Sequence, residues 1–114
     1  MSKIRQIGIR REPPGGWPLD ELFVGVATLR TTRELYRQEG TPFATPRPWD
    51  LAIWSGVSPQ GTANSLRRLE ALGLARALRP DRPGRAPSFA LERTHPLHQP
   101  LAGLFRAERA LVRR

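Results

Sequence analysis

Proline and glycine positions constrain the architecture of this chain more than any other feature of its sequence. The 114 residues include 12 prolines and 10 glycines. A proline interrupts a helix and lacks the N–H that a central strand needs, so regular elements must be short and separated by turns. This length allows one compact domain. We expect that domain over residues 19–114, preceded by a basic arm over residues 1–18 that contains a Pro-Pro-Gly-Gly run.

Three segments have the apolar spacing or the boundary residues of helices. Helical periodicity predicts the first over residues 20–38, with Asp20 as its N-cap and Gly40 beyond its end. The apolar positions of this segment are Leu22, Phe23, Val26, Ala27, Leu29 and Tyr36. A short helix is expected over 48–54, between a proline that suits a first turn and Ser55-Gly56. Ser58 and Pro59 supply a cap and a first turn for a third helix over 58–72.

The pattern changes after Gly73, a residue that can adopt the positive φ of a helix C-terminus. Residues 74–78 and 87–91 suit two strands of a hairpin, joined by the loop RPDRPGRA. A last amphipathic helix is expected over 97–112. Its apolar stripe contains Leu97, Leu101, Leu104, Phe105, Leu111 and Val112.

This order of elements is that of an α+β winged helix-turn-helix domain with an added C-terminal helix. Residues 49–75, WDLAIWSGVSPQGTANSLRRLEALGLA, resemble the helix-turn-helix of ArsR- and MarR-type bacterial and archaeal transcriptional regulators. The resemblance depends on Leu51-Ala52, on Gly56-Val57-Ser58 in the turn, and on residues 66–70 followed by Gly73-Leu74. It implies a DNA-binding regulator, with helix 58–72 as the recognition helix and residues 74–91 as the wing.

The third helix carries side chains suited to DNA on the face opposite its apolar positions. If Thr62, Leu66 and Leu69 face the core, Gln60, Asn64 and Arg67 face outward. Amide side chains pair with adenine and arginine pairs with guanine in the major groove. Gly61 and Ala63 keep the first turn slim, so its N–H groups are expected to approach phosphate closely. The alternative for each of these residues is an ordinary solvated helix surface.

Positive charge is concentrated near the wing. The net charge is +9, and 18 of the 19 basic residues are arginine. A high-GC genome also enriches arginine, so an anionic partner has to be inferred from where the arginines lie and not from their number. Residues 67–93 hold seven arginines and three acids. We therefore expect phosphate contacts from the wing, with Arg82 or Arg85 entering a minor groove. The full set expected to contact DNA is Ser58, Gln60, Gly61, Ala63, Asn64, Arg67, Arg68, Arg79, Arg82 and Arg85.

Other function classes find little support in the sequence. The absence of cysteine excludes disulfides, thiolate catalysis and thiolate metal sites. His95 and His98 have only Glu92 as an adjacent carboxylate, too few ligands for a metal site. We expect no catalytic residues, no metal and no cofactor. With no signal core or membrane-spanning run, we expect a cytoplasmic protein that joins the nucleoid when bound to DNA.

Partners follow from this interpretation. Double-stranded DNA is the expected partner. It is bound by a homodimer that forms through helix 97–112, alone or together with helix 20–38, and so presents two recognition helices. One alternative is a winged helix that serves as a protein-interaction module in a larger assembly. Another is RNA binding, for which exposed aromatics beside basic residues are typical. Trp49 and Trp54 would favour either alternative if they were exposed on the surface. Their expected role is instead burial against a neighbouring helix.

Overall fold

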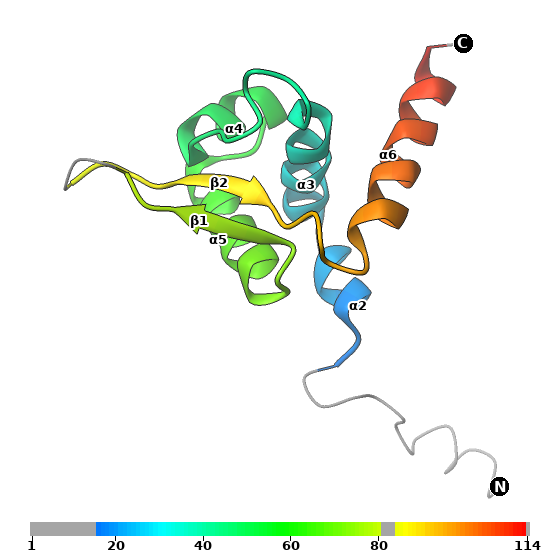
Figure 1. Ribbon diagram of the computed structural model, residues 1–114, viewed down its shortest axis with the longest axis horizontal. Coiled ribbons are helices and arrows are strands. Elements are labelled where there is room, and N and C mark those ends of the chain that lie inside the picture. Colours follow the sequence, from blue (N-terminus) through cyan, green and yellow to red (C-terminus); the bar gives the residue numbers. More distant parts are fainter. Residues whose placement is uncertain (1–15, 81–83, 114) are drawn as a thin grey trace, which may run out of the picture.

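The computed structural model describes residues 16–80 and 84–113, which form helices around a two-stranded antiparallel sheet (Figure 1). The helices are α2 (Pro18–Leu22), α3 (Val26–Gln38), α4 (Pro48–Ser55), α5 (Pro59–Ala71) and α6 (His98–Val112). Strands β1 (Ala75–Leu78) and β2 (Ser88–Leu91) lie between α5 and α6. This order confirms the predicted α+β winged helix-turn-helix. Residues 1–15 of the predicted arm lie outside the described residues.

The helix expected over residues 20–38 is two helices, so that prediction was wrong. Gly25 takes an extended conformation, with φ −164° and ψ 165°, and is the N-cap of α3. Glycine is a poor helix former because fixing its backbone costs more entropy than for other residues, which explains a break at this position. Asp20 is not an N-cap, because α2 begins at Pro18. The apolar stripe is broken as well: Leu22 is fully buried whereas Val26 is 62% exposed.

Threonines make up half of the buried residues of α3, although the prediction placed only apolar side chains on this face. Thr28, Thr31 and Thr32 are buried there, and they are matched on α5 by buried Thr62 and Ser65. The Ser65 hydroxyl donates to the Gly61 carbonyl at 2.8 Å and lies 3.2 Å from Oγ1 of Thr28. Side chains this small let two helices pack closely, so α3 holds α5 through a polar and tightly fitted contact.

Leucines and aromatic residues fill the remainder of the core. Its members from every helix and from the hairpin are Leu22, Leu35, Tyr36, Leu51, Leu66, Leu69, Leu74, Ala75, Phe89, Leu101 and Phe105. The predicted inner face of α5 is confirmed, since Thr62, Leu66 and Leu69 are at most 1% exposed. Among the described residues, no helix is both long and apolar enough to cross a membrane.

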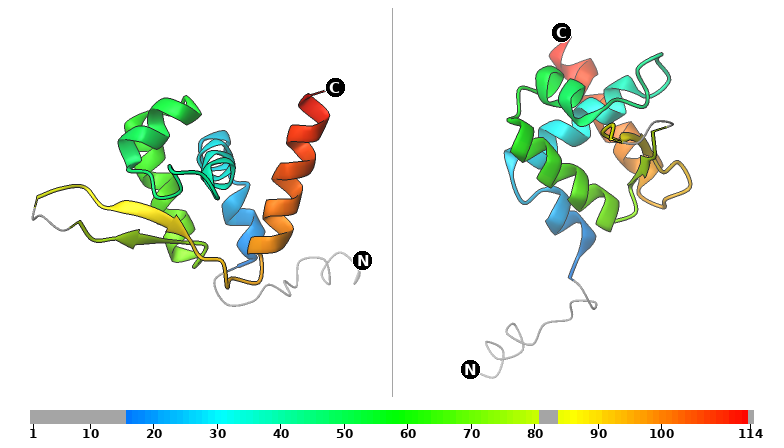
Figure 2. Two further views of the ribbon diagram at one scale, coloured as in Figure 1. Left: turned by 45° about the horizontal axis from the view of Figure 1, so that its top comes forward. Right: turned by 90° about the vertical axis from the view of Figure 1, so that its left-hand side faces the viewer.

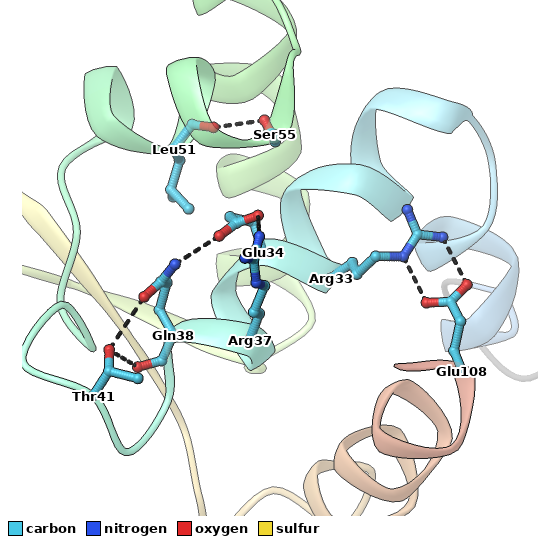
Figure 3. A network of polar contacts seen from close by, with 8 residues as sticks. All are labelled: Arg33, Glu34, Arg37, Gln38, Thr41, Leu51, Ser55 and Glu108. Atoms are coloured by element: carbon cyan, nitrogen blue, oxygen red, sulfur yellow. Dashed lines mark hydrogen bonds and ion pairs between the residues drawn. The ribbon is translucent and has the colours of Figure 1, made fainter. Parts of the chain in front are cut away.

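Polar contacts at the edge of this core connect α3 to its neighbours (Figure 3). Arg33 on α3 and Glu108 on α6 form a two-pronged ion pair, with N–O distances of 2.7 and 3.0 Å. On the side of α3 near α4, the buried Glu34 carboxylate accepts a hydrogen bond from the Gln38 amide at 2.7 Å and lies 3.5 Å from the Arg37 guanidinium. The pair between Arg33 and Glu108 thus joins α6 to α3.

Tyr36 joins α3 to α6 by packing its ring 5.2 Å from that of His98 and 5.4 Å from that of Phe105. Its side chain is buried, and its hydroxyl has no hydrogen-bond partner among the residues that the structure describes. Burial, with a smaller contribution from the Glu39 charge, raises the pKa of Tyr36 from 10.0 to about 12. The folded protein therefore favours the neutral phenol more strongly than the unfolded chain does.

The expected result for Tyr36→Phe is a free energy of unfolding that is unchanged or higher by about 1 kcal/mol at neutral pH, because an unpaired buried hydroxyl is removed. In the wild type, the stabilisation linked to this phenol is complete below pH 10 and is lost as the pH rises from 10 to about 12. The variant should lack this loss. Urea unfolding across that pH range measures both effects, and an equal alkaline loss in the two proteins would contradict the assignment.

The hairpin pairs its two strands and is joined to the segment before α4 by a backbone hydrogen bond. Ala75 pairs with Leu91 and Leu78 with Ser88 in antiparallel register. The Phe89 N–H also donates to the Pro46 carbonyl at 3.0 Å, which joins β2 to the loop before α4. Figures 1 and 2 show that α5 and the hairpin lie together at the end of the molecule away from α6.

Candidate nucleic-acid interface

The turn between α4 and α5 has the backbone that its sequence predicts. Gly56 ends α4 with φ +72°, in the left-handed region that favours glycine, and its N–H donates to the Ala52 carbonyl at 3.1 Å. The hydroxyl of Ser58, the N-cap of α5, then accepts a hydrogen bond from the Gly61 N–H at 3.0 Å. The predicted cap is confirmed. This turn fixes the direction in which α5 leaves α4.

The outward side of α5 carries Gln60, Asn64 and Arg67, all exposed. The Gln60 amide nitrogen donates to Oδ1 of Asn64 at 3.1 Å, and the Arg67 guanidinium donates to the same oxygen. The three side chains therefore form one row, held by hydrogen bonds between its own members. Asn64 keeps its amide N–H donors and Arg67 keeps most of its five. This row, which we call the α5 row, can pair with base edges.

The other expected contacts on α5 are placed differently. A side chain at Gly61 would lie 3.0 Å from Cγ1 of Val57 and 3.7 Å from Cβ of Ala27, so its small size is explained by packing against the turn and α3. Ala63 is half-buried. Arg68 points toward α2, where its guanidinium lies 2.9 Å from the Glu21 carboxylate. Gly61 and Arg68 are thus not brought together with the α5 row.

The wing arginines differ in whether they form an ion pair with a carboxylate of the described residues. Arg76 on β1 forms an ion pair with Glu92 at 2.6 Å, which neutralises part of the expected charge. Arg79 and Arg85 are exposed, and together with Arg47 they line a hollow of about 530 Å³ at the base of the hairpin loop. Arg82 lies outside the described residues. Arg47 was not among the residues expected to contact DNA, because that expectation covered only helix 58–72 and the wing at 74–91.

Comparison with known proteins agrees with this geometry. No family model matches the chain, and no curated protein matches it. The crystal structure of transcriptional regulator PA3341 is similar, with a TM-score of 0.60 and 28% sequence identity over 83% of this chain. This chain has the fold of a winged helix-turn-helix regulator. The resemblance expected from residues 49–75 is confirmed, although the aligned part spans only 64% of the length of PA3341.

In this winged helix, the two tryptophans of α4 are exposed, although they were expected to be buried. Trp49 is 65% exposed and Trp54 is 38% exposed. Trp54 stacks edge to face on exposed Phe43, with ring centroids 5.7 Å apart, and Ile53 beside it is 62% exposed. The prediction that both tryptophans pack against a neighbouring helix was wrong, because Leu51 and Ala52 supply the buried side of so short a helix. An aromatic patch remains on the outer side of α4.

Both histidines of the winged helix have contacts that explain them without a ligand. His95 accepts a hydrogen bond from the Leu97 N–H at its Nδ1, and its Nε2 donates to the Leu72 carbonyl; both distances are 3.0 Å. Nε2 of buried His98 lies 3.3 Å from the Glu39 carboxylate. His95 thus fastens the loop before α6 to the end of α5, while His98 connects α6 to the end of α3.

Proposed function

We propose that this protein is a transcriptional regulator that binds double-stranded DNA, with α5 in the major groove and the hairpin along the phosphate backbone. The observation that carries the proposal is the α5 row: an adenine-pairing amide and a guanine-pairing guanidinium stand exposed on the second helix of a helix-turn-helix. The similarity to transcriptional regulator PA3341 supports DNA-binding regulation in general. The residues that contact DNA are our inference from the side chains themselves.

The mechanism that follows is occupancy of an operator. Hairpin arginines supply affinity that does not depend on sequence, because they neutralise phosphates and release counterions. The α5 row supplies the choice of site through base edges. Bound at a promoter, the protein would compete with the transcription machinery or recruit it, and no catalytic step is required.

The decisive experiment recovers the DNA that the protein selects. The full chain is incubated at moderate salt with sheared DNA from its source genome, and the retained fragments are sequenced. We expect a shared motif with two related half-sites about 10 base pairs apart. The matched control is Arg106→Ala, which removes an exposed arginine from α6 without touching α5 or the hairpin. Retained fragments without a common motif would contradict sequence-specific regulation.

One observation favours a second candidate function, a protein-interaction module. An aromatic patch on and beside α4 exposes more adjoining apolar side chains than a helix that only faces solvent normally does. It consists of Phe43, Trp49, Ile53 and Trp54 and lies outside the α5 row. If this is the main function, the chain should retain no duplex DNA at low salt. Single-stranded RNA in the same retention assay tests the third alternative, since stacking on exposed aromatics is typical of RNA binding.

We further propose that the regulator is a homodimer formed through α6, with a contribution from α2. α6 is longer than its contact with α3 requires: Leu101 and Phe105 are buried, whereas Leu104, Leu111 and Val112 are 53–79% exposed. Leu97, Leu104 and Leu111 follow one another at intervals of seven residues, the spacing of a helix-pairing seam. Near the start of α6, Trp17 and Leu19 of α2 add apolar surface around Leu97.

The expected result for the double variant Leu104→Glu/Leu111→Glu is a folded monomer at tens of micromolar, where the wild type sediments as a dimer. Both leucines are exposed, so the fold should survive, while two carboxylates in the seam would repel those of a second copy. The matched control, Gln99→Glu/Ala110→Glu, adds the same charge at exposed positions on another side of α6 and should stay dimeric. A monomeric wild type, with or without DNA, would overturn the proposal.

A further inference from the structure

The hollow at the base of the hairpin brings together three arginines that are far apart in the sequence. Arg47 immediately precedes α4, Arg79 follows β1, and Arg85 lies in the loop before β2. All three line one hollow of about 530 Å³. The remainder of its lining is small or apolar and comes from Leu78, Pro80, Ala86 and Ser88. The hollow thus brings together arginines from the segment before α4 and from the hairpin, with no acidic residue in its described lining.

Backbone hydrogen bonds hold Arg47 at this place. The preceding carbonyl, that of Pro46, accepts from the Phe89 N–H at 3.0 Å. The N–H of Arg47 itself donates to the Asp50 carboxylate at 3.3 Å. Because Ser88 pairs with Leu78, these bonds place Arg47 beside the end of both strands. The position of Arg47 is therefore set by the fold, while its side chain is exposed.

The arginines of the hollow differ from several other described arginines of the surface, which are held by glutamates. Arg33, Arg68, Arg76 and Arg93 each form an ion pair with a glutamate. Arg47, Arg79 and Arg85 form none with a described carboxylate, and the nearby Asp50 is engaged by a backbone N–H. Like charges that converge in this way repel one another until an anion is bound. A guanidinium binds phosphate oxygens through two parallel N–H donors, so the group that fits best is a phosphate.

We propose that this hollow is a phosphate-binding site in which Arg47 acts together with Arg79 and Arg85 on one phosphate group. The inference rests on the proposed function, in which that group is a phosphate of the DNA backbone beside the hairpin. Its ligands come from both the N-terminus of α4 and the hairpin. One bound phosphate therefore links the helix-turn-helix to the wing and fixes the angle at which the hairpin meets the duplex.

A double-mutant cycle tests whether the arginines share one phosphate. Arg47→Ala, Arg85→Ala and their combination are titrated with a preferred and a scrambled duplex at three salt concentrations, with Arg106→Ala as the control. Arg47→Ala should weaken binding to both duplexes by similar factors, about 3- to 10-fold, as expected for a contact that carries no sequence information. The combination should weaken binding by less than the product of the single effects and lower the salt slope by about one unit for each protomer bound to the duplex.

Two outcomes of this titration would overturn the proposal. If Arg47→Ala binds like Arg106→Ala, Arg47 contacts no phosphate. If the effects of Arg47→Ala and Arg85→Ala multiply and the slope falls by about two units for each bound protomer, the two arginines contact separate phosphates. Circular dichroism of each variant checks folding, which should be retained because both side chains are exposed.

A second measurement separates the failure of this site from the failure of the proposed function. Inorganic phosphate is added to the full chain without DNA, and the arginine Nε–H signals are followed by NMR. Saturable shifts of the signals from Arg47, Arg79 and Arg85 together, lost in Arg47→Ala, would support the hollow even if the wild type binds no duplex. The site would then hold a phosphate from a small molecule. A wild type that responds neither to duplex nor to inorganic phosphate would overturn the proposal.

Discussion

Raising the salt concentration from about 50 to about 200 mM is expected to weaken binding to duplex DNA about 150-fold. This figure assumes a dimer that neutralises about four phosphates in total, for which the slope of log K against log salt is about −3.6. The cations that would do so lie in the hairpin and at its base, where Arg79 and Arg85 are exposed and form no ion pair with a described carboxylate. Fluorescence anisotropy of a labelled duplex at four salt concentrations gives the slope.

The slope also distinguishes the candidate functions. The interaction module would be favoured instead by two results together. The chain would bind a protein partner with an affinity that hardly changes with salt, and it would have no affinity for duplex DNA even at low salt. Arg76→Ala is a useful internal control, because Arg76 lies on the same hairpin but is held by Glu92 at 2.6 Å. Its loss should change the slope less than the loss of Arg85 does.

Removing Arg67 or Asn64 is expected to reduce discrimination between the preferred and a scrambled duplex by about 5- to 150-fold for each residue. The estimate corresponds to about 1–3 kcal/mol for one well-formed paired contact with a base. The two changes should not be independent, since the Arg67 guanidinium donates to Oδ1 of Asn64 and each side chain orients the other. Parallel titrations of both duplexes with the single variants and the double variant provide the ratios.

Arg85→Ala is the comparison for these variants. A phosphate contact should weaken preferred and scrambled duplex by similar factors and leave the ratio unchanged. If the α5 variants and the hairpin variant all kept wild-type affinity and discrimination, α5 and the hairpin would not be the DNA-contacting surface.

Local backbone rules account for the part of the fold that sequence analysis predicted correctly. Ser58 caps α5, and Gly56 and Gly73 have φ of +72° and +77°, because these requirements are set within a few residues. The inner face of α5 was equally predictable from its spacing. Helical periodicity alone could not reveal the break at Gly25, since the apolar residues on both sides of it continue the same spacing.

The errors concern properties that depend on tertiary contacts. Thr28, Thr31 and Thr32 are buried because α5 offers small hydroxyl partners, which no pattern within α3 indicates. The exposure of Trp49 and Trp54 likewise depends on which side of α4 the core uses. Arg47 reaches the wing only through the hydrogen bond between Phe89 and Pro46, residues more than 40 positions apart in the chain. Local signals thus predicted the α5 row but not the second half of the candidate interface.

The separation of the two sides of α5 has a consequence for how such a protein can change during evolution. Among the described residues, Gln60, Asn64 and Arg67 hydrogen-bond only to one another, whereas Thr62 and Ser65 on the inner side fill a close contact with α3. Substitutions in the outer three should therefore have little effect on folding, and under the proposed function they would alter which operator is chosen. A duplicated copy could acquire a new set of target genes through these positions alone, while the inner side keeps the scaffold unchanged.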